Sequence, residues 1–230
     1  MQHVPLFGLL TTLVVYSCAY ALNRFFGRCA LLNPALISIA TVIALLWALG
    51  ISYDEYYATG ARWLHECLGP VIVALAIPLY SQGKKLKTMR WPLLFALGVG
   101  STAGIACGAY IGWHLRVTPD SVLALGAKSA TVPIAIGLVE GAGGNAALAA
   151  VIAIGTGICG ALCGLAVLRF LGVHDDGEKG FALGLSAHGI GTARAFLLSQ
   201  EAGAFAGLGM ALNGILTALL YPQLLEPLLV

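Results

Sequence analysis

Long apolar stretches separated by short polar loops leave this chain few folds to choose from. They cover residues 5–22, 31–51, 63–82, 91–115, 121–139, 145–171, 180–198 and 203–229. About 20 apolar residues are enough for a helix to cross a bilayer core about 30 Å thick. Because 59% of the residues are hydrophobic and only 10% are charged, the chain is far less charged than a soluble domain. The sequence predicts an all-α polytopic membrane helix bundle with about eight membrane segments, forming one domain over residues 1–230.

Composition and motifs also exclude several function classes. The net charge of +2 and the absence of a basic stripe speak against a nucleic-acid partner. No nucleophile elbow, zinc-protease motif or phosphate-binding loop is present, so we expect no enzyme activity, no cofactor and no metal. Cys159 and Cys163 share a helical face, but no histidine or third cysteine accompanies them, and we interpret them as packing residues.

Positive charge in two short loops predicts the orientation of the first half. Loop 23–30 holds Arg24 and Arg28, and loop 81–90 holds three lysines and Arg90. Because Lys and Arg favour the cytoplasmic side, both loops are expected in the cytoplasm and the N-terminus outside.

The apolar segment 121–139 contains a lysine and a predicted break. In "GAKSATVPIAIG", Pro133 lacks an N–H and disfavours helix at the residue before it. Ser129 and Thr131 can satisfy freed backbone groups or bind a ligand. The second half-helix would present its N-terminus to an anion, and Lys128 adds a full charge there. The alternative is that Lys128 extends to the membrane interface.

The segment 180–198 repeats this pattern. In "SAHGIGTARA", Gly189 and Gly191 are expected to break the helix, and His188, Thr192 and Arg194 surround the break. No Asp or Glu lies within either segment, so these cationic groups have no obvious local partner. Charge at membrane depth is costly and usually faces a pathway or a partner. The two segments together suggest a place for a small anion.

Three of these polar residues also allow a purely structural interpretation. His188 can serve as a hydrogen bonder between packed helices, and Arg194 can pair with Glu201 or Glu140. Asn213, a strongly polar residue within the last apolar segment, can contact a ligand or form an interhelical amide hydrogen bond.

Small residues four apart mark two helices for close packing. The first set is Gly100, Gly104, Gly108 and Gly112, and the second is Thr156, Gly160 and Gly164. Such a ridge lets another helix approach closely where no hydrophobic effect acts between helices. Packing within one bundle explains it, and a sliding contact or a contact between two copies is the alternative.

A weak internal repeat connects the two interrupted segments. "LALGAKSA" begins at Leu123 and "FALGLSAH" at Phe181, an offset of 58 residues, and "LGPVIVALAIPL" from Leu68 provides a third, shorter match. Repeated, interrupted segments are a pointer to a transporter binding site.

Motifs along nearly the whole chain resemble one known family. "NPALISI", "LGPVIVALAIPLY", "KSATVPIAI", "GFALGLSAHGIGTARA" and "GMALNGILTALLYP" are similar, in this order, to the LrgB/CidB family of antiholin-like proteins. The resemblance implies control of murein hydrolase export and cell lysis, or transport of small carboxylates such as pyruvate, glycolate and glycerate. It also implies a membrane partner of the LrgA/CidA type.

The cations at the breaks favour the carrier over the regulator. We expect an inner-membrane carrier of small monocarboxylates in which Lys128 and Arg194 attract the carboxylate. Ser129, Thr131, His188 and Thr192 would hydrogen-bond the solute, with Asn213 as a further contact. The alternatives are an antiholin-like regulator without a solute of its own and, third, a holin-like pore.

Overall fold

The computed structural model describes residues 6–27 and 32–229, apart from the side chains of residues 68, 72 and 226–229. The regular elements of this part are helices without any strand, which confirms the predicted all-α class. Residues 5 and 31, where two predicted segments begin, lie outside the described residues, as do Arg28 and Cys29. The chain divides into two compact units, Met1–Ala74 and Leu75–Val230. The single domain expected over the whole chain stays a prediction.

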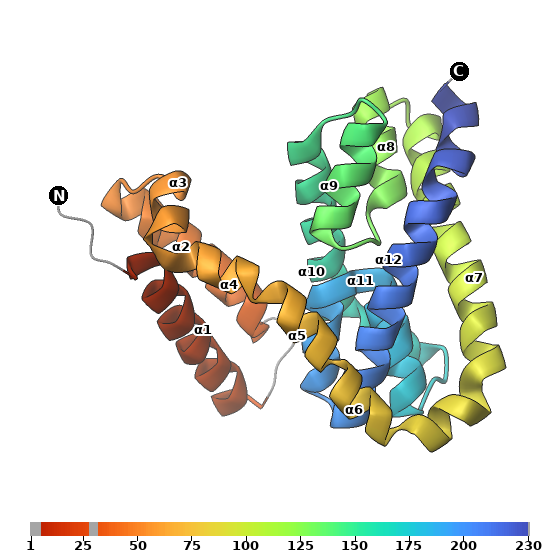
Figure 1. The fold of residues 1–230 in the computed structure, drawn as a ribbon, viewed down its shortest axis with the longest axis horizontal. Coiled ribbons are helices and arrows are strands. Elements are labelled where there is room, and N and C mark those ends of the chain that lie inside the picture. The colour runs from red at the N-terminus through yellow and green to blue at the C-terminus, as the bar shows by residue number, and fades with distance from the viewer. Residues whose placement is uncertain (1–5, 28–31, 230) are drawn as a thin grey trace. The chain divides into compact units, whose positions relative to one another are not determined.

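The first unit combines two longer helices with several short ones. These are α1 (Phe7–Phe25), α2 (Pro34–Leu49), α3 (Tyr53–Tyr56), the π-helical turn η2 (Tyr57–Ala61), α4 (Arg62–Glu66) and α5 (Leu68–Ala74) (Figure 1). α2 begins at Pro34 because the Asn33 side chain accepts a hydrogen bond from the Ala35 N–H at 2.9 Å, and proline suits the first helical position. Gly8 allows close packing, since a Cβ there would lie 2.1 Å from the backbone oxygen of Tyr56.

The second unit contains three long helices and the two interrupted segments. Its elements are α6 (Ala76–Ser81), α7 (Gly83–His114), α8 (Pro119–Ala127), α9 (Val132–Gly141), α10 (Ala146–Phe170), α11 (Asp176–Phe196) and α12 (Gln200–Leu229) (Figure 1). Every candidate site residue lies in this unit.

Four helical stretches in the described part are long and apolar enough to cross a membrane. They are Tyr53–Ser81, Gly83–His114, Ala146–Phe170 and Gln200–Leu225, and two shorter apolar helices are Pro34–Leu49 and Val132–Gly141. Length and composition thus indicate a multi-pass membrane protein. The count of eight membrane segments stays a prediction.

The segment between α7 and α10 folds back on itself as a helical hairpin, which we name HP1 (residues 119–141). Residues 128–131 join α8 to α9 and belong to neither helix. A Cβ on Gly144, just after α9, would lie 2.9 Å from Leu123 in the middle of α8, so the end of HP1 lies against its first arm. Each arm rises only about 15 Å, half of a bilayer core. HP1 therefore enters the bundle to about its middle and returns.

α11 forms a second hairpin, which we name HP2. Ala187 (φ −127°, ψ 16°) and His188 (φ 41°, ψ −131°) leave helical geometry. A Cβ on Gly191 would lie 2.3 Å from the Leu183 carbonyl oxygen, whereas residues eight apart in a straight helix are about 12 Å apart. The chain therefore reverses at Ala187 and His188, just before Gly189, and not at the two glycines that we expected to break the helix.

HP1 and HP2 enter the second unit from opposite ends. α10, with 25 residues, rises about 37 Å, and HP1 precedes its first residue while HP2 follows its last. Figure 1 shows α8 and α9 beside the C-terminal half of α12, and α11 beside its N-terminal half. The first arm of HP2 packs closely along α12, since a Cβ on Gly180 or Gly184 would lie 2.0 or 1.9 Å from the backbone oxygens of Ala202 or Ala206.

The glycine ridge of α7 faces these two hairpins. A Cβ on each glycine would lie 3.1 Å from the Leu185 side chain (Gly100), 3.4 Å from Ser129 Oγ (Gly104), 2.4 Å from Leu125 O (Gly108) and 2.9 Å from Leu125 Cδ1 (Gly112). The two shortest approaches involve the glycines that pack on α8. The lack of side chains on this face thus lets HP1 lie directly on the α7 backbone.

α10 packs on HP2 in the same way as α7 packs on HP1. A Cβ on Gly160 would lie 2.5 Å from Ala187 Cβ, and one on Gly164 would lie 2.7 Å from Leu183 Cδ2. At the offset of 58 residues, Ala187 and Leu183 correspond to Ser129 and Leu125 of HP1. Those two residues are the ones that face Gly104 and Gly108 on α7. The two helix–hairpin pairs therefore use matching contacts, while the internal repeat itself stays a prediction.

One lysine ties the two ends of HP2 to the start of α7. Lys85 Nζ donates to the carboxylates of Asp175, which caps α11, and of Glu201 in the first turn of α12. Burial opposes ionisation of Asp175, but hydrogen bonds from Lys85 and from the Glu178 N–H outweigh it and hold the pKa of this carboxyl below its ordinary value. These charges keep both ends of HP2 together.

We expect Gly108→Ala to destabilise the protein by roughly 1–3 kcal/mol, because the added methyl group would overlap the backbone of α8. Gly98→Ala, on the same helix, is the matched control, since a Cβ there meets nothing within 4 Å. Thermal unfolding in detergent measures both variants. Equal unfolding temperatures would contradict the close packing of α7 on HP1.

Candidate functional site

Lys128 lies at the tip of HP1, against the backbone of α7. Its Nζ donates to the carbonyl oxygen of Gly104 at 3.2 Å and lies 3.4 Å from Ser129 Oγ. The missing side chain of Gly108 leaves room for the lysine, because a Cβ there would lie 3.3 Å from Lys128 Cε. Lys128 forms no ion pair within the described residues. In this part of the chain, the hydrogen-bond partners of the half-buried ammonium are thus two neutral oxygens, those of Gly104 and Ser129.

The break beside Lys128 follows from local sequence. Pro133 occupies the first turn of α9, where its missing N–H costs nothing, and the residue before it resists helix. Thr131 is extended (φ −64°, ψ 151°) and its side chain does not cap the helix. The N-terminus of α9, with the positive end of its dipole, therefore points into the tip beside Lys128.

Asn213 holds the tip of HP1 from α12. Its side-chain Nδ2 donates to the Ser129 carbonyl at 2.8 Å, and its Oδ1 accepts from Ser101 Oγ at 2.6 Å and from Thr217 Oγ1 at 3.4 Å. Only 1% of Asn213 is exposed. The interhelical amide hydrogen bond considered from the sequence is therefore present.

His188 occupies the tip of HP2 and points to α10. Its Nε2 lies 2.9 Å from the Ala153 carbonyl, which can only accept, so Nε2 carries the proton of this hydrogen bond. Gly157 makes room for the ring, since a Cβ there would lie 2.7 Å from Cε1. Thr192 Oγ1 donates to the His188 carbonyl at 2.8 Å. A histidine at positive φ is a strained residue held by its surroundings.

One turn of α12 contacts both tips. Asn213 bonds Ser129 in HP1, and Met210, three residues earlier, has its sulfur 3.9 Å from Thr192 Oγ1 in HP2. Three residues span only about 4.5 Å along a helix. The two contacts on α12 therefore lie at nearly the same depth.

The other two long helices also place the tips at one level. On α7, Gly104 faces the tip of HP1 and Gly100, one turn away, faces the first arm of HP2. On α10, Ala153 bonds His188 and belongs to the same buried cluster as Ala130 at the tip of HP1. The two tips thus contact α7 and α12 at a similar level in the second unit.

The predicted site residues fall into three places. Lys128, Ser129 and Asn213 are joined by hydrogen bonds at the tip of HP1, with Thr131 at the start of α9. His188 and Thr192 are joined at HP2. Arg194 is buried in the second arm of HP2, about 9 Å along the helix from His188, so it is not at the tip itself.

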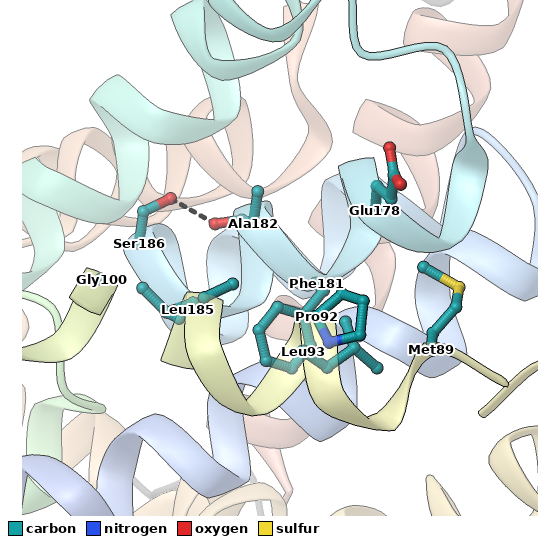
Figure 2. A pocket seen from close by; sticks show the side chains of 10 residues that line it. Met89, Pro92, Leu93, Gly100, Glu178, Phe181, Ala182, Leu185 and Ser186 are labelled. Carbon is teal, nitrogen blue, oxygen red and sulfur yellow. Dashed lines mark hydrogen bonds between the residues drawn. The ribbon is translucent and has the colours of Figure 1, made fainter. Parts of the chain in front are cut away.

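A hollow of about 450 Å³ lies between α7 and the first arm of HP2. Figure 2 shows Pro92, Leu93 and Phe181 facing it, while the Glu178 carboxylate points away from them. Ser186 donates its hydroxyl hydrogen to a carbonyl of its own helix, that of Ala182. The lining of this hollow is apolar, so it is not a suitable binding site for an anion.

Sequence reasoning missed three contributors to the site. Ser101 was overlooked because it directly follows Gly100, one of the ridge glycines on which the packing argument concentrated. The signal that could have identified it is that a buried hydroxyl on an apolar helix needs a polar partner, here Asn213. Ala153 and Gly104 act through backbone carbonyls, which no side-chain pattern reveals.

The long apolar helices and the two half-length hairpins define a multi-pass membrane protein with two interrupted segments. The chain belongs to the LrgB-like family, whose model matches residues 12–226.

Curated relatives cover nearly the whole chain. A Bacillus subtilis (strain 168) protein named uncharacterized protein YwbG is 33% identical over 223 residues, covering 97% of this chain and 98% of the relative. Proteins named holin-like protein CidB from Staphylococcus aureus (strain Mu50) and Staphylococcus epidermidis (strain RP62A) are 30% and 29% identical, each match covering 94% of both chains. No solved structure matches the chain.

We expect His188→Ala to destabilise the protein more than His188→Gly. Both changes remove the hydrogen bond to Ala153, but only alanine keeps the unfavourable positive φ, worth about 1–3 kcal/mol. Thermal unfolding of the two variants in one detergent measures the difference. An alanine variant as stable as the glycine variant would show that the backbone at HP2 is not strained.

Proposed function

We propose that this protein is an inner-membrane carrier that binds a small monocarboxylate, of the pyruvate, glycolate or glycerate type, between the hairpin tips. The observation that carries the proposal is Lys128, whose ammonium, among the described residues, has only neutral oxygens as hydrogen-bond partners at a helix break in mid-bundle. Non-helical backbone at membrane depth is tolerated where it is buried or lines a cavity, and interrupted helices mark solute sites in transporters. The proposal involves no catalysis, cofactor or metal.

Each residue near the tips has a role in this proposal. Lys128 attracts the carboxylate in place of the Gly104 carbonyl, and the N-terminus of α9 adds a favourable dipole. Ser129 and Thr131 supply hydrogen bonds to the solute. His188 and Thr192 would do so in exchange for their present bonds to the carbonyls of Ala153 and His188, and Arg194 adds positive potential from the second arm of HP2. Hairpins entering from opposite ends would expose the solute to the two sides in turn.

The second candidate is an antiholin-like regulator of murein hydrolase export and cell lysis, acting with an LrgA/CidA-type membrane partner or a second copy of the chain. The comparisons favour it more directly than the carrier, because curated relatives are named holin-like proteins. Nothing in that function, however, calls for a lysine at the tip of HP1. A carrier whose transport influences cell lysis would be consistent both with the position of Lys128 and with the names of the relatives.

Uptake of labelled pyruvate or glycolate into liposomes containing the purified protein tests the carrier. We expect saturable uptake that unlabelled monocarboxylates inhibit. Lys128→Ala should lower uptake at subsaturating solute by about ten- to a hundredfold, the range for losing a charge-assisted hydrogen bond. Lys84→Ala, which removes an exposed lysine of the same unit, should leave uptake unchanged.

Equal uptake by the Lys128→Ala variant would remove Lys128 from the site. If the wild type shows no uptake while release of murein hydrolase depends on the protein and its membrane partner, the regulator becomes the better account.

A further inference from the structure

We propose that Asn213 is a positioning residue, which fixes the tip of HP1 and does not contact the solute. The inference concerns the same site as the proposed carrier and rests on it for its effect on transport. Its structural part, the clamping of the tip, can be tested without any solute.

The hydrogen bonds of Asn213 leave its amide little capacity for a ligand. An amide oxygen has two lone pairs and the NH₂ group two donors. Both lone pairs are directed to Ser101 and Thr217, and one N–H is directed to the Ser129 carbonyl. Because that carbonyl can only accept, the NH₂ group must face Ser129, which also fixes the orientation of the amide.

The clamp solves a specific problem of the interrupted helix. Ser129 lies between α8 and α9, so its carbonyl has no place in a helical ladder. A buried carbonyl without a partner costs several kcal/mol in an apolar environment. Asn213 supplies that partner from α12, and Ser101 holds Asn213 from α7. Three elements are thus joined at one buried amide.

The position of the clamp connects it to Lys128. Ser129 Oγ lies 3.4 Å from Lys128 Nζ, and a Cβ on Gly104 would lie 3.4 Å from the same oxygen. Anchoring the Ser129 backbone therefore sets where the lysine leaves the tip. Losing the anchor should weaken solute binding while leaving the lysine and its charge in place.

Two variants that leave Asn213 in place but remove one of its hydrogen-bond partners distinguish a clamp from a ligand. Ser101→Ala removes the 2.6 Å hydrogen bond, and Thr217→Val removes only the 3.4 Å one with little change in shape. Thr156→Val is the control, because its hydroxyl bonds a carbonyl of its own helix, Ile152. The full chain is compared with these variants and with Asn213→Ala.

The first readout is hydrogen exchange of the backbone amides of residues 129–132 and 134 without solute. A clamp predicts faster exchange in Ser101→Ala and Asn213→Ala, a smaller change in Thr217→Val and none in Thr156→Val. The second readout is the KM for pyruvate uptake, which we expect to rise about three- to tenfold in Ser101→Ala with less than about a twofold change in maximal rate.

The outcomes separate this inference from the proposed function. Unchanged exchange in both Ser101→Ala and Asn213→Ala would overturn the clamp, whether or not the wild type transports pyruvate. An Asn213→Ala variant that loses uptake while Ser101→Ala keeps wild-type KM and exchange would make Asn213 a direct ligand and also overturn it. If no protein transports pyruvate but exchange rises as predicted, the clamp stands and the carrier falls.

Discussion

The second unit depends on how it satisfies backbone polar groups where its helices are interrupted. The Ser129 carbonyl, at the tip of HP1 between two helices, illustrates the constraint, because it accepts a hydrogen bond from Asn213 on α12. A buried carbonyl without a hydrogen-bond partner costs several kcal/mol in an apolar environment. At the tip of HP2 the His188 side chain bonds the Ala153 carbonyl of the uninterrupted helix α10, which anchors the second interruption to a neighbouring helix. These partners in turn bring the two tips to one level on α10 and α12.

Glycine makes this arrangement sterically achievable. HP1 lies on α7 at Gly108 and HP2 lies on α10 at Gly160, where any side chain would overlap the hairpin. Such close contact brings the α7 backbone within reach of Lys128, which bonds the carbonyl of Gly104. The same small residues that allow tight packing thus give the lysine neutral oxygens as partners, and its charge stays available for an anion.

The sequence predicted which segments are helical and interrupted, but not that the chain reverses direction at each interruption. Pro133 correctly placed the first break, because proline has strong and local backbone preferences. The second break was predicted near His188–Thr192 and lies at Ala187 and His188, so its region was found. The glycines expected to cause it, Gly189 and Gly191, stay helical, and Gly191 serves the close approach of the two arms. Tertiary contacts decide which of several permissive residues takes the unusual conformation, and they also decide that each segment returns on itself.

Site residues divide in the same way. Lys128 and Asn213 could be identified from the sequence because polar side chains in apolar membrane segments are costly and usually have a partner or a function. Their partners could not, because the Gly104 carbonyl and Ser101 become relevant only once α7 lies against HP1. Arg194 was expected to act beside Lys128. Because the chain reverses at Ala187 and His188, Arg194 lies in the second arm of HP2, and the residues around it in the sequence do not reveal this reversal.

The central claim is that both hairpins enter the membrane halfway and return on the side from which they came. Labelling of single cysteines with a membrane-impermeant thiol reagent tests it, in a protein whose six native cysteines are replaced. The exposed positions that flank the hairpins are Val117 and Ala142 for HP1, and His174 and Gln200 for HP2. We predict that Val117→Cys and Ala142→Cys react from one side of the membrane and His174→Cys and Gln200→Cys from the other. Reaction of Val117→Cys and Ala142→Cys from opposite sides would show that HP1 crosses the membrane and would contradict the account.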